Sequence, residues 1–414
     1  MMQIDTAIVG AGQAGLAMSV ALSTRGVEHV LLERGTVANS WKTERWDSLT
    51  TLTPNWANGL PGAPYAGADP DGFMHVSELV RNMDAYAGLI QAPVQHHTQV
   101  LSATPQDGGF LIRTSQRPLT CRALVIASGA SSRPTIPGVA SALPDGIAQT
   151  VPPLYKRPTD LPPGEVLVVG ASASGVQIAR ELLLAGHPVT IAVGSHLRMP
   201  RRYRGQDIEW WLDALGFMDE RAEEIDDLTR ARRLPSPQLY GGPDPVDLNA
   251  LQDMGARVVG RLMDVRGGKA LFSGGLSGTV TGADLKMHRL LDDIDRWITD
   301  HGLDSTLSPP DRPAPTRLPP NPELSRGFGL GAIRSVVWAT GFRPDLDWLS
   351  LPAFDPRGRL RHQGGVVSVP GVYAMGMPIL RRRRSHQISG VGQDAEALAA
   401  HLHGHLSGRA IAAA

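Results

Sequence analysis

Short apolar runs rich in β-branched residues recur along the chain, and most of them lead into a glycine-containing turn. Runs of this kind are typical of parallel strands, which helices cover on both faces. Between them lie stretches with apolar residues at helical spacing, such as 16–22 and 176–184. The alternation predicts an α/β fold with parallel sheets. The expected strands are 6–9, 29–32, 124–129, 166–169, 187–193 and 335–341.

The first glycine turn follows the strand 6–9 and contains Gly10, Gly12 and Gly15. In a dinucleotide-binding unit the first glycine permits a tight turn, the second admits the pyrophosphate, and the third lets the helix pack on the strand. Amide N–H groups at the helix N-terminus hold the pyrophosphate charge. Glu33 closes the second strand about 20 residues later, where a carboxylate accepts hydrogen bonds from an adenosine ribose. This order predicts a dinucleotide site rather than a glycine-rich turn of another α/β protein.

The second glycine turn, Gly170 to Gly175, repeats the plan with Ser172 in place of the middle glycine. No acid follows at the place that corresponds to Glu33. Instead the next loop carries Ser195, Arg198, Arg201 and Arg202. Arginine binds phosphate through a bidentate fork, so this loop favours the ribose 2′-phosphate of NADPH over NADH. The alternative is a solvated basic loop. Two dinucleotide units in one chain indicate an electron-transfer enzyme with a resident flavin and a visiting nicotinamide.

The composition narrows the class of protein. The chain has 414 residues, enough for two domains, and its 40 basic residues balance 40 acidic ones. Total charge therefore indicates neither a nucleic-acid nor a membrane partner. Cys121 is the single cysteine, which excludes a CxxC redox pair and a disulfide within the chain. A cytoplasmic location is expected, because no signal peptide precedes the first strand and no apolar run approaches a membrane helix. No metal is expected, because no histidine pair has ligand spacing with a supporting carboxylate.

The placement of the turns predicts two Rossmann-like dinucleotide-binding domains, with the NADPH domain inserted into the FAD domain. Residues 1–150 and 331–414 are expected to form the FAD-binding domain, and residues 151–330 the NADPH-binding domain with an insertion at 200–320. The proline-rich stretch 309–322 is interpreted as a bare linker. The strand 335–341 is expected to return the chain to the first domain, and residues 394–406 to form a helix beside it.

Several motifs resemble those of the two-dinucleotide-binding-domain flavoproteins. They are the two glycine turns, Ala127-Ser128-Gly129 and Ala339-Thr340-Gly341. The stretches 40–49, 53–56 and 339–345 are further similar to class B flavin monooxygenases, the group of flavin-containing monooxygenases, Baeyer–Villiger enzymes and the YUCCA type. The resemblance implies that NADPH reduces bound FAD, and that dioxygen adds to the reduced flavin as a C4a-hydroperoxide. One oxygen atom then passes to the substrate. Such a site must exclude water and offer hydrogen-bond donors to the peroxide.

The chain departs from that family at two positions. The family fingerprint FxGxxxH falls on residues 143–150, where Gln149 or Thr150 stands in place of the histidine. The peroxide-stabilising asparagine of the animal enzymes falls near Leu52, which cannot donate a hydrogen bond. Asn55 either takes over that role or is a turn residue before Trp56.

The predicted site residues divide by cofactor. Expected FAD contacts are Gly10, Gly12, Gln13, Ala14, Gly15, Glu33, Arg34, Ser40, Trp41, Trp46, Ser128, Gly129, Thr340, Gly341 and Gly376. Expected NADPH contacts are Gly170, Ser172, Ser174, Gly175, Ser195, Arg198, Arg201 and Arg202. Asn55, His386 and Gln387 are the catalytic candidates; the last two open the final helix, whose N-terminus would favour a reduced flavin anion. Trp41 and Trp46 either wall the flavin ring or belong to the core.

The run Arg381–Arg384 is the densest charge in the chain. Such a run is either a solvated face or, so close to the expected flavin site, a guide for an anionic or carrier-bound substrate.

These features lead to one main hypothesis and three alternatives. The main hypothesis is an FAD-dependent, NADPH-driven monooxygenase that oxygenates nitrogen, sulfur or an activated carbon of a small molecule with a C4a-hydroperoxyflavin. The alternatives are Baeyer–Villiger oxygenation of a ketone, an NADPH oxidase or flavin reductase that forms hydrogen peroxide, and a non-catalytic NADP-sensing flavoprotein. A disulfide reductase is excluded by the single cysteine.

Overall fold

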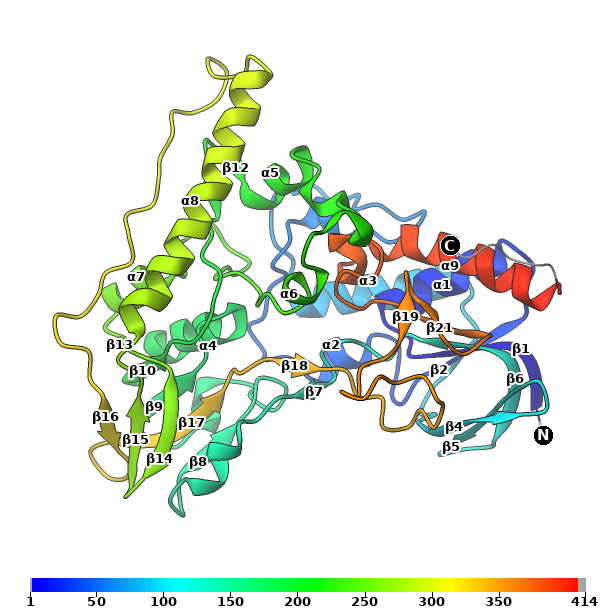
Figure 1. Ribbon diagram of the computed structural model, residues 1–414, viewed down its shortest axis with the longest axis horizontal. Coiled ribbons are helices and arrows are strands. Elements are labelled where there is room, and N and C mark those ends of the chain that lie inside the picture. The colour runs from blue at the N-terminus through cyan, green and yellow to red at the C-terminus, as the bar shows by residue number, and fades with distance from the viewer. Residues whose placement is uncertain (1, 409–414) are drawn as a thin grey trace.

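The computed structural model describes residues 2–408, whose two largest sheets are covered by helices (Figure 1). The strands of the first sheet are β1 (Met2–Val9), β2 (His29–Leu32), β3 (Val94–Gln95), β4 (Val100–Gln106), β5 (Gly109–Thr114), β6 (Leu119–Ile126), β19 (His362–Gln363), β20 (Val366–Val367) and β21 (Val372–Ala374). Their order is β19-β20-β21-β6-β1-β2-β3, with β5 beside β6 and β4 beside β5. The pairs from β21 to β3 are parallel, and the remaining pairs are antiparallel. The predicted α/β fold is confirmed.

The second sheet is parallel throughout. Its strands are β8 (Ala148–Thr150), β9 (Glu165–Val169), β10 (Val189–Ala192), β13 (Arg257–Val259) and β17 (Ile333–Trp338). They lie in the order β13-β10-β9-β17-β8. The prediction that strand 335–341 returns to the first domain is therefore wrong, because β17 pairs with β9 from Ile333 opposite Glu165 to Trp338 opposite Val169. The chain crosses back only after β17, and residues 148–150 already belong to the second unit. The sequence of a fully apolar strand does not indicate which of two sheets the strand joins.

Helices cover both sheets. The first unit has α1 (Gln13–Ser23), α2 (Asn39–Thr43), α3 (Val76–Leu89) and α9 (Val391–Leu406), and the second has α4 (Ala173–Leu184). The predicted terminal helix is confirmed: α9 packs beside α1, as Figure 1 shows. Short strands and 3-10 helices complete both units: β7 (Arg133–Pro134), β18 (Phe342–Arg343), η1 (Asn55–Asn58), η2 (Gly138–Ala142), η3 (Pro158–Asp160) and η6 (Arg383–His386).

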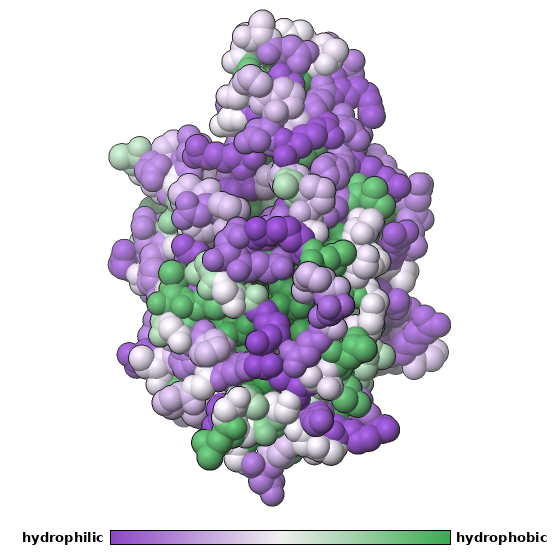
Figure 2. All heavy atoms as spheres, turned by 90° about the vertical axis from the view of Figure 1, so that its left-hand side faces the viewer, coloured by the Kyte–Doolittle hydropathy of each residue, from purple (hydrophilic) through white to green (hydrophobic). Residues whose placement is uncertain are grey.

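The insertion contributes α5 (Ile208–Ala214), α6 (Leu228–Ala231), α7 (Leu248–Asp253) and the long α8 (Leu276–Asp300). Its other elements are β11 (Arg202–Tyr203), β12 (Gln206–Asp207), β14 (Leu262–Arg266), β15 (Lys269–Phe272), η4 (Phe217–Asp219) and η5 (Ala222–Glu224). After the insertion, β16 (Ser325–Gly327) pairs with β15. The far end of α8 projects from the molecule and is largely hydrophilic (Figures 1 and 2). Among residues 2–408, no helix is both long enough and apolar enough to cross a membrane.

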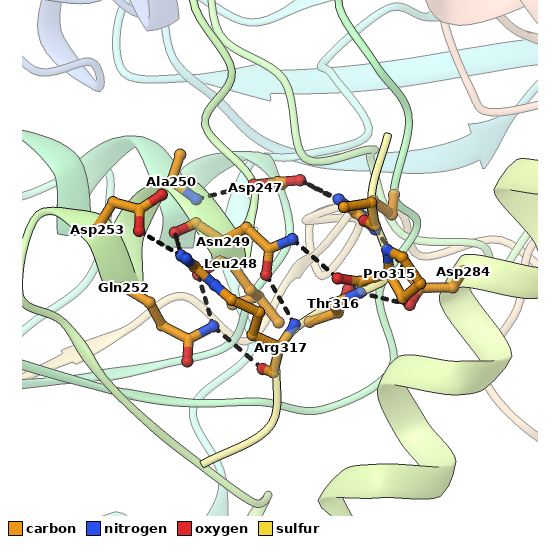
Figure 3. Close-up of polar contacts among 12 residues, drawn as sticks. Asp247, Leu248, Asn249, Ala250, Gln252, Asp253, Asp284, Pro315, Thr316 and Arg317 are labelled. Carbon is orange, nitrogen blue, oxygen red and sulfur yellow. Dashed lines mark hydrogen bonds and ion pairs between the residues drawn. The ribbon is translucent and has the colours of Figure 1, made fainter. Parts of the chain in front are cut away.

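The proline-rich stretch 309–322 is held along α7 and α8, so its interpretation as a bare linker is wrong. Thr316 donates from its backbone N–H and its hydroxyl to the carboxylate of Asp284, each at 2.8 Å. Arg317 donates to Asn249 from its backbone N–H and from its guanidinium, which also pairs with Asp253 at 2.5 Å (Figure 3). Arg312 pairs with two acids of α8. The stretch is extended because prolines forbid a helix, and side chains of its neighbours fix its course.

Candidate functional site

The first glycine turn leaves unfilled space at the N-terminus of α1. Gly10 has φ +107°, and a side chain there would lie 2.5 Å from the carbonyl oxygen of Ala127. A side chain at Gly15 would overlap the carbonyl oxygen of Gly10. By contrast, a Cβ on Gly12 would meet no described atom within 4 Å, and Gly12 caps α1 without a side-chain hydrogen bond. The free amides and the open space together fit a pyrophosphate.

Two polar groups beside this turn fit the rest of an adenine dinucleotide. Glu33 is buried at the end of β2, and its carboxylate accepts hydrogen bonds from the N–H groups of Ala11 at 2.9 Å and Gly35 at 3.0 Å. This fixes the carboxylate while lone pairs remain for ribose hydroxyls. The Ser128 hydroxyl is buried and has no hydrogen-bond partner within residues 2–408.

The second glycine turn has the same construction. Gly170 has φ +113°, and a side chain there would overlap the carbonyl oxygen of Ala339; one at Gly175 would overlap that of Gly170. Ser172 caps α4 in the place of Gly12, without a side-chain hydrogen bond. The carbonyl group of Ala339 therefore lies against Gly170 as that of Ala127 lies against Gly10. Thr340 and Gly341, expected to contact FAD, follow β17 in the second sheet and lie beside the second turn instead.

Two arginines expected to bind a 2′-phosphate are engaged within the protein. Arg198 is buried and bonds to Asp247, to Asp284 at 2.8 Å and to the carbonyl oxygen of Ala314. Arg201 is buried, pairs with Asp207 and donates to the carbonyl oxygen of Leu52 at 2.8 Å. Both guanidinium groups therefore bind other parts of the protein and do not support the expected phosphate contact.

Arg202 and Ser195 remain available to a ligand. Both are exposed, and the side chain of Arg202 has no ion pair or hydrogen bond to any residue that the structure describes. Of the four residues expected to hold the 2′-phosphate, these two keep that role as a proposal.

The two tryptophans expected near the flavin have different surroundings. Trp41 is half-buried in α2, and its indole N–H donates to the side chain of Gln13 at 3.3 Å, which places it beside the first turn. The guanidinium of Arg45 stacks on Trp41 at 4.9 Å. Trp46, however, is buried in the core of the second unit with Tyr155 and Val168. The core alternative therefore holds for Trp46, and Trp41 alone stays near the expected flavin.

The remaining expected FAD contacts lie around the first turn. Gly376 has φ +67°, and a Cβ there would lie 2.9 Å from that of Ala14. Ser40 is half-buried next to Trp41, and Arg34 is exposed and pairs with Glu44.

Asn55 does not have the free amide that a peroxide would require. Its side chain donates to the carbonyl oxygen of Asp69 at 2.8 Å and accepts from the N–H of Met74 at 2.8 Å. The residue is buried and ties the two ends of the loop 55–74 together. Of the two alternatives, the structure favours the turn role, since both ends of the amide are satisfied. Gln149, one of the two residues aligned with the family histidine, accepts a hydrogen bond from the indole N–H of Trp338 at 3.0 Å.

His386 and Gln387 lie where η6 passes into α9. His386 is exposed to solvent, yet burial by the surrounding protein lowers its pKa. The N-terminus of α9 follows at Val391. The catalytic role expected of the two residues stays a prediction.

The arginine run 381–384 connects the first unit to the insertion. Arg384 pairs with Asp213 of α5 and with Asp219, the latter at 2.9 Å. Arg383 pairs with Glu220 and lies over the ring of Phe217 at 4.2 Å. The expectation that this run guides an anionic substrate is not supported for these two residues, because acids of the insertion neutralise them. The sequence did not predict these pairings, because the partners lie far apart along the chain.

Comparisons with known proteins agree with this architecture. The family described as pyridine nucleotide-disulphide oxidoreductase matches residues 7–214. A relative from Geobacillus kaustophilus, described as an uncharacterized oxidoreductase CzcO-like, is 29% identical over 398 residues, which cover 95% of this chain and 97% of the relative. Indole-3-pyruvate monooxygenase YUCCA6 from Arabidopsis thaliana is 28% identical over 209 residues, 48% of this chain and 50% of that protein. A flavin-containing monooxygenase from Stenotrophomonas maltophilia shares the fold, with a TM-score of 0.68 at 17% identity over 97% of this chain and 98% of that one.

Proposed function

Because the chain belongs to the pyridine nucleotide-disulphide oxidoreductase family, we propose that it is an NADPH-driven flavin monooxygenase that oxygenates nitrogen, sulfur or an activated carbon of a small molecule. The resemblance to class B flavin monooxygenases is confirmed by the relatives and the fold. The chain is an oxidoreductase, and its cofactors are FAD and NADPH. The single, buried cysteine leaves no thiol pair for disulfide chemistry, and burial raises its pKa to about 12.

One observation carries this proposal: the two glycine turns are built alike, but only the first has an acid at the end of its second strand. That acid is the buried carboxylate of Glu33, which suits the unphosphorylated ribose of FAD. After β10 the second unit has no acid at the matching place, and Arg202 is exposed in the next hairpin. The difference supports FAD in the first unit and NADPH in the second.

The protein's own residues would bind, orient and shield the reactants. The amides at the start of α1 and α4 would hold the two pyrophosphates, and Trp41 would flank the flavin. The ion pairs of Arg384 with Asp213 and Asp219 hold α5 against η6. In this proposal that contact shields the flavin site from water. The flavin, once reduced, supplies the electrons that activate dioxygen.

A second candidate, an NADPH oxidase that forms hydrogen peroxide, is favoured by one specific observation. Leu52 has no donor, and the amide of Asn55 is engaged at both ends. A site without these donors stabilises activated oxygen less well. Baeyer–Villiger oxygenation has no such support.

The reductant can be tested by mixing the FAD-loaded protein with NADPH or NADH without oxygen and following the loss of flavin absorbance. At low nucleotide concentration, NADPH should reduce the flavin faster than NADH. Arg202→Ala should make the two reduction rates more alike, whereas the control Arg266→Ala, at another exposed arginine, should leave the difference between them unchanged. Equal reduction by both nucleotides would contradict the assignment of the second site. The reaction is then tested in air with thioethers, amines and ketones, where product should account for the NADPH consumed.

A further inference from the structure

A cavity of about 540 Å³ lies in the first unit, between the helix α3 and the loop 58–67. This volume is within the range of small-molecule sites in proteins, roughly 300–1,000 Å³. The lining is exposed on one side, where Ala85 and Leu89 of α3 meet solvent, and buried on the other, where Met74 and Ile388 lie. The cavity therefore opens at the surface and ends inside the protein.

The closed side of the cavity lies next to the place expected for the flavin. Ile388, one of its buried lining residues, stands between η6 and α9. A Cβ on Gly392, in the first turn of α9, would lie 2.9 Å from the ring of Pro61, so the start of this helix packs on the loop 58–67. On the other wall, α3 packs against α2, the helix that carries Trp41. The walls therefore contact both elements that are expected to border the flavin ring, α2 and the N-terminus of α9.

The walls offer a ligand mainly apolar surface. Large apolar side chains come from both walls: Leu60, Met74, Leu79 and Met83. The hydroxyl of Tyr86 is already bonded, because it donates to the carbonyl oxygen of Pro61 at 2.7 Å. The amide of Asn58 likewise donates to the carbonyl oxygens of Thr53 and Pro54. Since methionine side chains adapt their shape to what they contact, such walls suit apolar ligands of varied outline.

The lining has one sign of charge. Among the described residues that line the cavity, Glu78 alone carries a charged side chain. It is half-buried, and its carboxylate has no hydrogen bond or ion pair with any residue between 2 and 408. An anionic ligand would therefore meet a like charge without a basic group in the walls to offset it. The cavity selects against anions.

We propose that this cavity binds the substrate, and that the substrate is an uncharged, apolar thioether whose sulfur lies at the closed end. This inference rests on the proposed monooxygenase function and names its substrate class. The overall reaction consumes the thioether, dioxygen, NADPH and a proton, and it gives the sulfoxide, water and NADP⁺. The assignment does not fit the anionic substrate that the arginine run 381–384 suggested.

Two aryl thioethers test the selection by charge: thioanisole, which is uncharged, and 4-(methylthio)benzoate, which carries a carboxylate. Binding of each to the oxidised, FAD-loaded protein is measured by calorimetry and by the change in flavin absorbance, and turnover by sulfoxide formation. The wild type should prefer thioanisole. Glu78→Gln should lower that preference about 10-fold, because a like charge a few ångströms away in a partly screened site has an effect of this order. The control Glu28→Gln, at an exposed acid outside the cavity, should leave it unchanged.

Two substitutions test the location by filling space. Ala85→Trp narrows the cavity from α3 and Ala66→Trp from the loop, and both positions are exposed, so the fold should tolerate them. Each should raise the Kd of thioanisole about 10-fold, the effect of losing about 60 Å² of apolar contact. The control Ala400→Trp, at an exposed alanine of α9 outside the cavity, should not raise it. Melting temperatures of the three variants show that they are folded.

The outcomes separate the cavity from the reaction. Absence of thioanisole binding, equal Kd values in the wild type and in both cavity variants, or binding that leaves the flavin absorbance unchanged would overturn the assignment of the cavity. An unchanged preference in Glu78→Gln would overturn the selection by charge. Binding that follows the expected pattern without any sulfoxide would instead count against the monooxygenase function.

Discussion

Replacement by alanine should have different effects at two glycines of the first turn that are three residues apart: Gly15→Ala should lower stability, and Gly12→Ala should weaken FAD binding. In Gly15→Ala the new methyl group overlaps the carbonyl oxygen of Gly10 and lies 3.1 Å from its carbon. Both are backbone atoms under α1, so no side chain can move aside. Overpacking of this kind costs about 1–3 kcal/mol, which lowers the melting temperature by about 2–12 °C even without cofactor. Gly12→Ala meets nothing within 4 Å among the described atoms and has extended backbone angles, φ −88° and ψ −169°.

The ligand-free Gly12→Ala protein should therefore be as stable as the wild type, or about 0.4–1 kcal/mol more stable. Its methyl group occupies the space that we assign to the pyrophosphate. Loss of one charged hydrogen bond weakens FAD binding about 10- to 100-fold. Calorimetry of the ligand-free proteins and titration with FAD, followed by flavin fluorescence, separate the two effects. Wild-type FAD affinity in Gly12→Ala, or an unchanged melting temperature in Gly15→Ala, would refute the geometry of the turn.

Three further outcomes are expected. Arg384→Ala should loosen α5 and increase the share of NADPH that ends as hydrogen peroxide, at an unchanged rate of flavin reduction. The control Arg296→Ala, which breaks an exposed ion pair on α8, should not change the peroxide yield, and identical yields in both variants would argue against the shielding role. Asp284→Ala leaves the buried Arg198 with one carboxylate partner and removes both hydrogen bonds of Thr316, so it should lower the free energy of unfolding, measured by calorimetry, by about 3–5 kcal/mol. The control Asp300→Ala, at an exposed acid, should change it little. Asp394→Asn should stabilise the protein at pH 7, with a gain that fades toward pH 4. Burial raises the pKa of Asp394 from 3.8 to about 6, so the cost of ionising it develops between these pH values and stays constant above pH 6; a gain that persists at pH 4 would contradict this sign.

Local sequence determines the two glycine turns, which is why they could be predicted. The conformation of each glycine depends on neighbours within a few residues and on one strand crossing, and the carboxylate of Glu33 lies at the end of a strand that is itself readable. The helix that packs beside α1 was predictable for the same reason, since its apolar residues recur at helical spacing.

Long-range partners explain what sequence did not reveal. Arg198 belongs to Asp247 and Asp284, 49 and 86 residues away, and a basic loop looks the same whether or not such acids fold back onto it. The strand β17 could have joined either sheet, because its apolar residues suit both. Asn55 seemed a possible donor only while its contacts with Asp69 and Met74 were unknown.

Oxygen-isotope labelling tests the central claim most directly. The FAD-loaded protein is supplied with NADPH, a small thioether and ¹⁸O₂, and both the sulfoxide and hydrogen peroxide are measured. The monooxygenase account predicts one ¹⁸O atom in each sulfoxide and a product yield close to the NADPH consumed. Hydrogen peroxide equal to the NADPH consumed, with no labelled product from this or any other amine, sulfide or ketone, would contradict it and identify the protein as an oxidase.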